Sequence, residues 1–196
     1  MRSRLLVAVV AVFLPVLGMA QVQPAGNRFP LNLSIGAGMD YWSGDWGAAN
    51  IHRWGPAAWA TVSIWRGLGV NAEGHSMNVG GNNFASSYKY YVAEGGPIYV
   101  FHHWNRIEPY AKAELGFASL THPSNFSGHL HDTSNTWAIG GGIEYHTWGP
   151  MWTRVDYTYD AFPNFHSSIT GQNHILNPQG IAFGESFRFG QQSSRF

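Results

Sequence analysis

The residues most able to do chemistry are charged side chains at alternate positions of several apolar segments. Arg154 and Asp156 stand two residues apart in one segment, and Lys112 and Glu114 do so in another. Residues two apart on a β-strand share a face, where they can meet charges from neighbouring strands. The pattern predicts either a buried ion-pair network or an acid-lined path for cations. It comprises seven acids and three bases: Asp40, Glu73, Glu94, Glu108, Lys112, Glu114, Glu144, Arg154, Asp156 and Arg188.

Histidines raise the separate question of a metal site, since the chain has ten of them. A His-x-His pair beside an acid has the ligand types that bind Zn²⁺ or Ni²⁺. There is no cysteine to complete such a site, and flexible loops lose entropy when they close round an ion. We therefore expect no bound metal and no cofactor. The residues concerned are His122, His129, His131, Asp132, His166 and His174.

The composition limits the class of protein that could hold these residues. The 196-residue chain is 44% hydrophobic, 15% aromatic and only 11% charged, whereas a soluble domain carries about 25% charged residues. A formal net charge of zero disfavours nucleic-acid binding, and the lack of cysteine excludes a disulfide scaffold. The high glycine content, 24 residues, favours strands and turns over long helices.

The first twenty residues have the pattern of a secretory signal peptide. Arg2 and Arg4 precede an apolar stretch at residues 5–17, and Gly18 and Ala20 put small residues before a cleavage site. The apolar stretch is too short to cross about 30 Å of hydrocarbon as a helix. The sequence therefore predicts a signal peptide at 1–20 and one exported domain at 21–196.

The exported part alternates with period two, as β-strands do and helices do not. Eight segments show this pattern, which is an even number, as bacterial transmembrane barrels have. Short breaks carrying Trp65, Trp104 and Trp148 alternate with longer ones at 43–56, 79–87, 119–134 and 161–178. The predicted strands are 31–42, 57–64, 68–78, 88–101, 107–117, 136–145, 151–160 and 180–189.

Alternation fits either a soluble barrel with an apolar interior or a membrane barrel whose apolar face meets lipid. The polar faces here mix ion-pairing residues with glycine and alanine, which suits a narrow eight-stranded lumen. Alternating connection lengths indicate short periplasmic turns and longer external loops, and the three tryptophans suit an interfacial aromatic girdle. We therefore expect an all-β, eight-stranded, antiparallel up-and-down transmembrane β-barrel with both termini in the periplasm.

The pattern resembles the small outer-membrane barrels of Gram-negative bacteria, such as the OmpA transmembrane domain, OmpX and OmpW. It is most similar to the outer-membrane β-barrel-domain proteins common in acidobacteria. The resemblance implies insertion by the barrel assembly machinery, helped by an aromatic last strand that here ends at Phe189. It covers nearly the whole exported chain and rests on residues 95–97, 108–112, 140–145, 154–159, 176–180 and 186–189.

One further resemblance concerns catalysis. His166, Ser168 and Glu185 are similar to the His-x-Ser pair and outer-surface Glu of lipid A deacylases, which are also eight-stranded barrels. The spacing from Ser168 to Glu185 is longer than in that family, and the Asn-Ala-Gly after its serine is missing.

We expect a monomeric structural or surface-interaction protein of the outer membrane, not an enzyme. Its expected partners are outer-membrane lipid and lipopolysaccharide, with no nucleic acid. The alternatives left open are a narrow conduit for small solutes and a lipid A deacylase-like hydrolase.

Overall fold

A computed structural model describes residues 32–46, 49–80, 87–101, 104–123, 129–166 and 173–189. Within these ranges the regular structure is all β, and no helix is long and apolar enough to cross a bilayer. The strands are β1 (Asn32–Trp46), β2 (Ala49–Trp65), β3 (Leu68–Gly80), β4 (Ser87–Val100), β5 (Ile107–Pro123), β6 (His129–Trp148), β7 (Met151–His166), β8 (Asn173–Leu176) and β9 (Gln179–Phe189).

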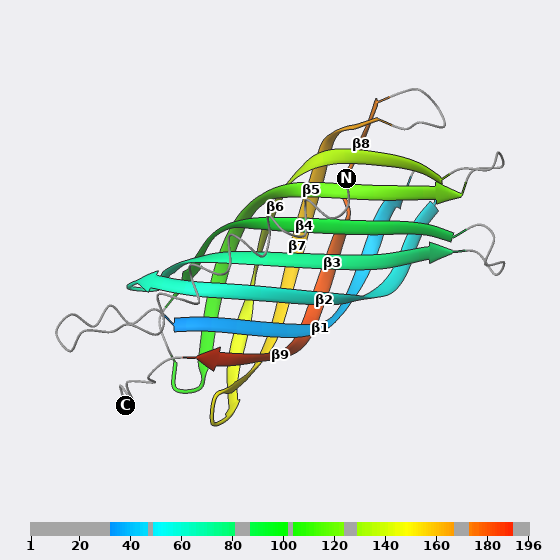
Figure 1. Cartoon of the computed structure of the whole chain (residues 1–196). Helices are drawn as coiled ribbons and strands as arrows, with labels where there is room; N and C mark the ends of the chain where they lie inside the picture. Colours follow the sequence, from blue (N-terminus) through cyan, green and yellow to red (C-terminus); the bar gives the residue numbers. More distant parts are fainter. Residues whose placement is uncertain are drawn as a thin grey trace. The chain divides into compact units, whose positions relative to one another are not determined.

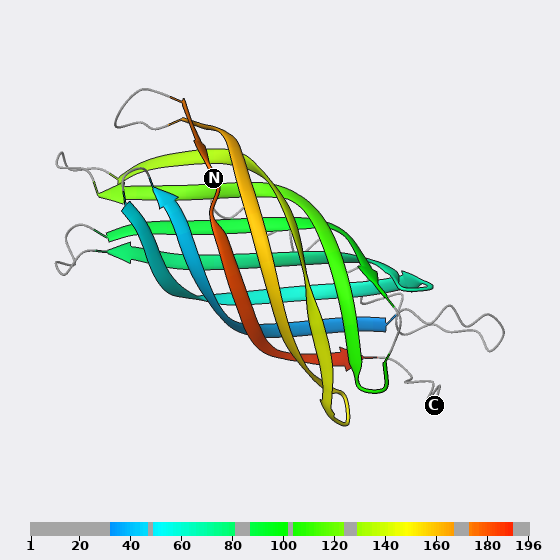
Figure 2. The same ribbon diagram turned by 180° about the vertical axis from the view of Figure 1, so that it is seen from behind.

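The strands form a closed antiparallel barrel (Figures 1 and 2). Each strand from β1 to β7 pairs with the next along the chain, and β9 pairs with both β7 and β1. The eighth strand is split, because β8 and β9 both pair with β7 and are separated at Asn177 and Pro178. The predicted eight-stranded, up-and-down architecture is confirmed.

The inside-out arrangement of side chains is also confirmed. On β1, Ile35 and Met39 are 48% and 40% exposed, whereas their chain neighbours Ser34 and Asp40 are 6% and 1% exposed. The same alternation runs along β5, where Leu115 is 73% exposed. Large apolar side chains therefore cover the outside, and most of the charged side chains on the strands face the lumen.

Several strands extend well beyond the segments predicted from apolar alternation, so three of the four expected long loops, at 43–56, 119–134 and 161–178, are wrong in extent. Most of 43–56 belongs to β1 and β2, which stay paired up to Trp46 and Ala49. The segment 119–134 is likewise mostly strand, with β5 and β6 paired up to Pro123 and His129. Backbone pairing can continue where the hairpin leaves the apolar layer, because it needs no apolar side chain.

The opposite end of the barrel has tight turns. Between β2 and β3, Arg66 and Gly67 both have positive φ angles, 43° and 86°, and a Cβ on Gly67 would lie 2.2 Å from the Val100 carbonyl oxygen. Trp65, Trp104 and Trp148 lie beside the turns at this end and are 61%, 63% and 78% exposed. These three positions are where an interfacial aromatic girdle is predicted.

A matched pair of substitutions on β6 tests which face meets lipid. Ile139 is 53% exposed and Ala138 is 2% exposed. Ile139→Arg should destabilise the barrel by about 2–4 kcal/mol if the residue lies near the bilayer midplane. Its folding yield into vesicles should depend on bilayer thickness, whereas that of Ala138→Arg should not. The opposite ranking, or folding of the unmodified protein as a β-rich monomer in plain buffer, would contradict the membrane orientation.

Candidate functional site

The centre of the lumen is occupied by Arg154, which is 1% exposed. Its Nε and one terminal nitrogen donate to Asp156 Oδ2 on the same strand, at 3.0 and 2.5 Å. The same terminal nitrogen donates to Glu73 Oε2 at 3.1 Å. Glu73 is on β3, four strands from β7 in either direction round the barrel. This one guanidinium therefore links opposite walls.

Aromatic rings hold the guanidinium from two further directions. The Arg154 guanidinium carbon lies 4.9 Å from the ring centroids of both Trp59 and Tyr110. Tyr110 also donates its hydroxyl proton to Asp156 Oδ2 at 2.7 Å. Cation–π contacts strengthen when the partners are desolvated, as they are here.

Lys112 on β5 adds a second buried cation. It forms an ion pair with Glu73, and its Nζ lies 3.2 Å from Asp156 Oδ2. Its Nζ also lies 3.4 Å from Glu114 Oε2. The side chain crosses over Gly140, where an added Cβ would come within 2.8 Å of Lys112 Cε. The glycine-rich run of β6 thus makes room for the lysine.

A separate layer lies toward the short-turn end. Arg188 on β9 donates to Glu108 Oε2 at 2.6 Å and to Glu144. Its guanidinium carbon lies 3.6 Å from the ring centroid of Trp152. The side chain of Arg188 is 21% exposed, which makes it the most accessible base of the network.

Toward the long-hairpin end, Glu73 links Arg154 to His75 through hydrogen bonds. His75 bonds to Asp40, and its Nε2 lies 3.1 Å from Glu73 Oε1. Above this level the lumen is filled by a cluster of seven buried apolar side chains: Trp42, Met77, Tyr90, Val92, Ala118, Leu120 and Phe162. The lumen of the described barrel is therefore occupied from an ion-paired layer at one end to an apolar layer at the other.

The ten charged residues singled out from the sequence all lie on the lumen face, and nine are buried. Their pairing differs in one respect from the neighbouring-strand contacts that the sequence suggests. Arg154 lies opposite Glu144 in the β6–β7 register, yet it hydrogen-bonds Glu73 across the lumen, while Glu144 binds Arg188. In a narrow barrel, a side chain as long as arginine can reach a partner on the opposite wall as easily as one on the adjacent strand.

Sequence reasoning omitted several lumen residues from the network. Asn71 is fully buried and donates to Glu114 Oε1 at 2.8 Å and to Glu73 Oε2 at 3.0 Å. His75 and Asp160 are buried as well. All three lie an even number of residues from a charged lumen residue on the same strand, Asn71 and His75 from Glu73 and Asp160 from Asp156. The period-two pattern therefore places them on the lumen face as well.

The resemblance to lipid A deacylases requires Glu185 to lie near His166, and the described backbone keeps these two positions apart. Glu185 is exposed on the lipid face as predicted, but it accepts a hydrogen bond from Thr153 Oγ1 at 2.7 Å. Thr153 is thirteen residues before His166 on β7, a separation of about 40 Å along a strand. Ser168 and the side chains of His122, His129, His131, His166 and His174 lie outside the described part, so the loop metal hypothesis is untested.

A closed antiparallel barrel with an apolar outer surface and a polar, ion-paired lumen is the structure of an integral outer-membrane protein. The sequence matches the family described as "Outer membrane protein beta-barrel domain" over residues 7–189. The chain belongs to this family and is an outer-membrane protein. The predicted export signal at residues 1–20 fits that location but lies outside the described residues.

Solved structures with the same fold come from several bacteria. Neisserial surface protein A is 14% identical, with a TM-score of 0.67, over 80% of this chain and 97% of that one. OprG from Pseudomonas aeruginosa is 14% identical, with a TM-score of 0.60, over 84% and 99%. Ail from Yersinia pestis, in complex with a heparin analogue, is 15% identical, with a TM-score of 0.54, over 81% and 97%. Among curated proteins, no sequence match was found.

Removing the central cation tests the energetic role of the lumen network. Arg154→Ala should lower the free energy of unfolding by about 3–5 kcal/mol, because Glu73 and Asp156 would lose a buried partner. The measurement is the urea midpoint in lipid vesicles. Arg66→Ala, at the exposed β2–β3 turn, is the control and should change stability by no more than about 0.5 kcal/mol. An unchanged midpoint for Arg154→Ala would show that the guanidinium is not a structural ion-pair partner.

Proposed function

We propose that this protein is a non-conducting outer-membrane barrel that presents its long hairpins for interactions at the cell surface. The observation that carries the proposal is the occupied lumen. Arg154 bridges β7 and β3 at the centre, and the apolar cluster that includes Trp42 and Phe162 fills the long-hairpin end. A solute would have to displace both layers.

The long hairpins are suited to surface interactions because their strands stay paired well beyond the segments with an apolar outer face. β5 and β6 run in continuous register from Ile107 and Tyr145 to Pro123 and His129. Paired strands are stiffer than unpaired loops and hold their tips in defined positions. Two structural neighbours, a surface protein and an attachment invasion locus protein, are named for surface roles. Those names support the proposal as analogies of fold alone.

A narrow cation conduit is the second candidate, because the described lumen holds more acids than bases. Nine buried or nearly buried carboxylates face only Lys112, Arg154, Arg188 and His75. An acid-lined path would favour cations. It would also need a continuous opening, and the side chains of an eight-stranded barrel are generally sufficient to fill its interior.

Planar-bilayer recording separates the two candidates. The purified protein should show no steady conductance under a salt gradient. Steady cation-selective current that falls in Glu114→Gln or Glu144→Gln would favour the conduit and overturn the non-conducting proposal. Background from other barrels is controlled with a mock purification from cells that lack the protein.

A surface role requires the long hairpins to face outward. A single cysteine replacing Ser127, between β5 and β6, should react with an impermeant maleimide on intact cells. A cysteine replacing Asn105, in the β4–β5 turn at the opposite end, should react only after the outer membrane is broken. The chain has no native cysteine, so the background is low. Labelling of the Asn105 position on intact cells would invert the topology.

A further inference from the structure

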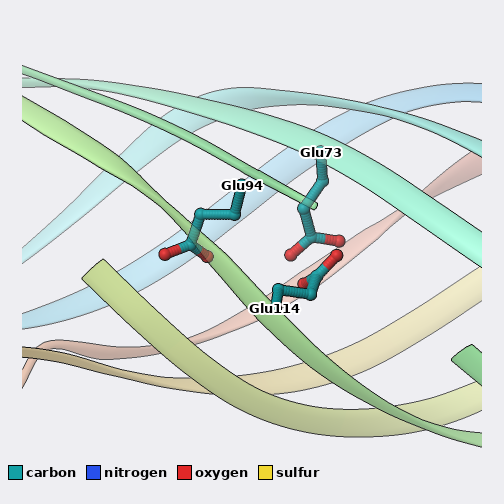
Figure 3. Close-up of side chains that lie close together, drawn as sticks. All are labelled: Glu73, Glu94 and Glu114. Carbon is teal, nitrogen blue, oxygen red and sulfur yellow. The ribbon is translucent and has the colours of Figure 1, made fainter. Parts of the chain in front are cut away.

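One acid of the barrel lies on its lipid-facing surface. Glu73, Glu94 and Glu114 lie close together inside the lumen (Figure 3) and are buried, whereas Glu185 on β9 is exposed on the outer face. A charged side chain in hydrocarbon is costly, so acids at such positions are rare and normally have a partner. The position of Glu185 therefore calls for a partner on the lipid side of the barrel wall.

The outer surface round Glu185 is apolar. Its direct cross-strand partners are Ala37 on β1 and Thr153 on β7. Lipid chains cover this surface in the membrane, because it belongs to the outer wall of the barrel. The next outward positions on the three strands carry exposed apolar side chains, namely Ile35, Met39, Val155, Phe183 and Phe187.

Two threonine hydroxyls connect Glu185 to the short-turn end of the barrel. Thr153 Oγ1 donates to Glu185 Oε1 at 2.7 Å, and Thr147 Oγ1 lies 2.7 Å from Thr153 Oγ1. A hydroxyl has one hydrogen, and that of Thr153 is used for Glu185, so Thr147 is the donor to Thr153. Thr147 precedes Trp148, the last residue of β6 and one of the tryptophans of the predicted girdle. A row of hydroxyls thus leads from the turn into the apolar wall.

Glu185 lies close to the interface between membrane and water. Its partner Thr153 is two residues after Met151, the first residue of β7, which is about 7 Å along a strand. Strands of such barrels are tilted by about 35–45°, so the depth below the turn is nearer to about 5 Å. A charge at that depth is far less costly than one at the bilayer midplane, and it can meet lipid headgroups.

The described part of the chain supplies no cation to Glu185. Its hydrogen bond there comes from Thr153, and no lysine or arginine among those residues forms a salt bridge with it. The arginines at the same end have other contacts, since Arg66 lies over the ring of Trp65 and Arg188 is paired in the lumen. A positive charge for Glu185 must therefore come from outside the described barrel.

We propose that Glu185, Thr153 and Thr147 form a binding site for a phospholipid whose headgroup ends in a primary ammonium. The ammonium donates charge-assisted hydrogen bonds to the Glu185 carboxylate. Like the ammonium of lysine it has three N–H donors, so it can also donate to the Thr147 hydroxyl oxygen. The acyl chains lie against the apolar surface that includes Phe183 and Phe187. The quaternary ammonium of phosphatidylcholine has no N–H and cannot make these bonds.

The expected topology brings this site to the right lipid. With the short turns in the periplasm, as the connection lengths predict, the site faces the phospholipid leaflet of the outer membrane and not the lipopolysaccharide leaflet. A lipid that binds the folded barrel and not the unfolded chain also stabilises the barrel. The site requires the outward position of Glu185 on β9, and it is independent of whether the lumen conducts.

The test is native mass spectrometry of the folded barrel released from bilayers with equal amounts of phosphatidylethanolamine and phosphatidylcholine of the same acyl chains. EDTA is present throughout, so that no divalent cation links the carboxylate to a lipid phosphate. The unmodified protein should retain the ethanolamine lipid about fivefold over the choline lipid, the size expected of one ion pair at an exposed site. Glu185→Gln should retain the two lipids equally, because the amide carries no charge.

Glu108→Gln is the matched control, because it removes an acid that faces the lumen, where Glu108 pairs with Arg188. It should keep the lipid preference of the unmodified protein. Thr153→Val removes the donor that orients the Glu185 carboxylate. It should lower the preference without abolishing it, because the charge remains.

A second series needs only the unmodified protein, so it holds even where a variant fails to fold. Stepwise N-methylation of the ethanolamine headgroup removes its N–H donors one at a time and keeps its positive charge, so retention should fall from the primary to the quaternary ammonium. Equal retention of all these headgroups would overturn the proposal. A preference that survives in Glu185→Gln, or that is lost equally in Glu108→Gln, would also overturn it, because the carboxylate of Glu185 would then not be the group that recognises the lipid.

Discussion

The structure depends on one constraint, which is that hydrocarbon offers no hydrogen-bond partner to the backbone. A strand edge left open there costs several kcal/mol for each unpaired group. β1 and β9 meet this constraint by pairing from Leu33 with Phe189 to Ser43 with Gln179. Once the barrel is closed, one face of every strand contacts lipid and the other faces a narrow interior. The period-two sequence pattern therefore separates lipid-facing residues from lumen-facing residues.

The narrow interior explains the character of the lumen side chains. Eight strands leave space for side chains and little else, so large residues lie against small ones on the next strand. Lys112 crosses Gly140, and Trp59 would collide with a Cβ placed on Gly36. The charges that remain must pair across the barrel, and Arg154 does so with Glu73.

Different parts of such a barrel are under different physical constraints. The outer face is set by lipid and the lumen by packing and charge balance, which leaves the hairpin tips free to vary. Barrels with 14–15% identity to this chain share its fold and carry different names and titles. The lipid-facing Glu185 resembles a catalytic acid in the sequence, and in the structure it accepts a hydrogen bond from Thr153 on its neighbouring strand.

The sequence by itself determined the strand faces, because each residue's parity decides whether it meets lipid or lumen. It therefore predicted the barrel, its inside-out polarity and the ten charged lumen residues. It missed the extent of the hairpins, since backbone pairing beyond the apolar band leaves no hydrophobic signal. It also missed which charges pair. Partners such as Arg154 and Glu73 are 81 residues apart in the chain and on opposite walls, so their contact depends on barrel closure and strand register. Only the tertiary structure fixes those two quantities.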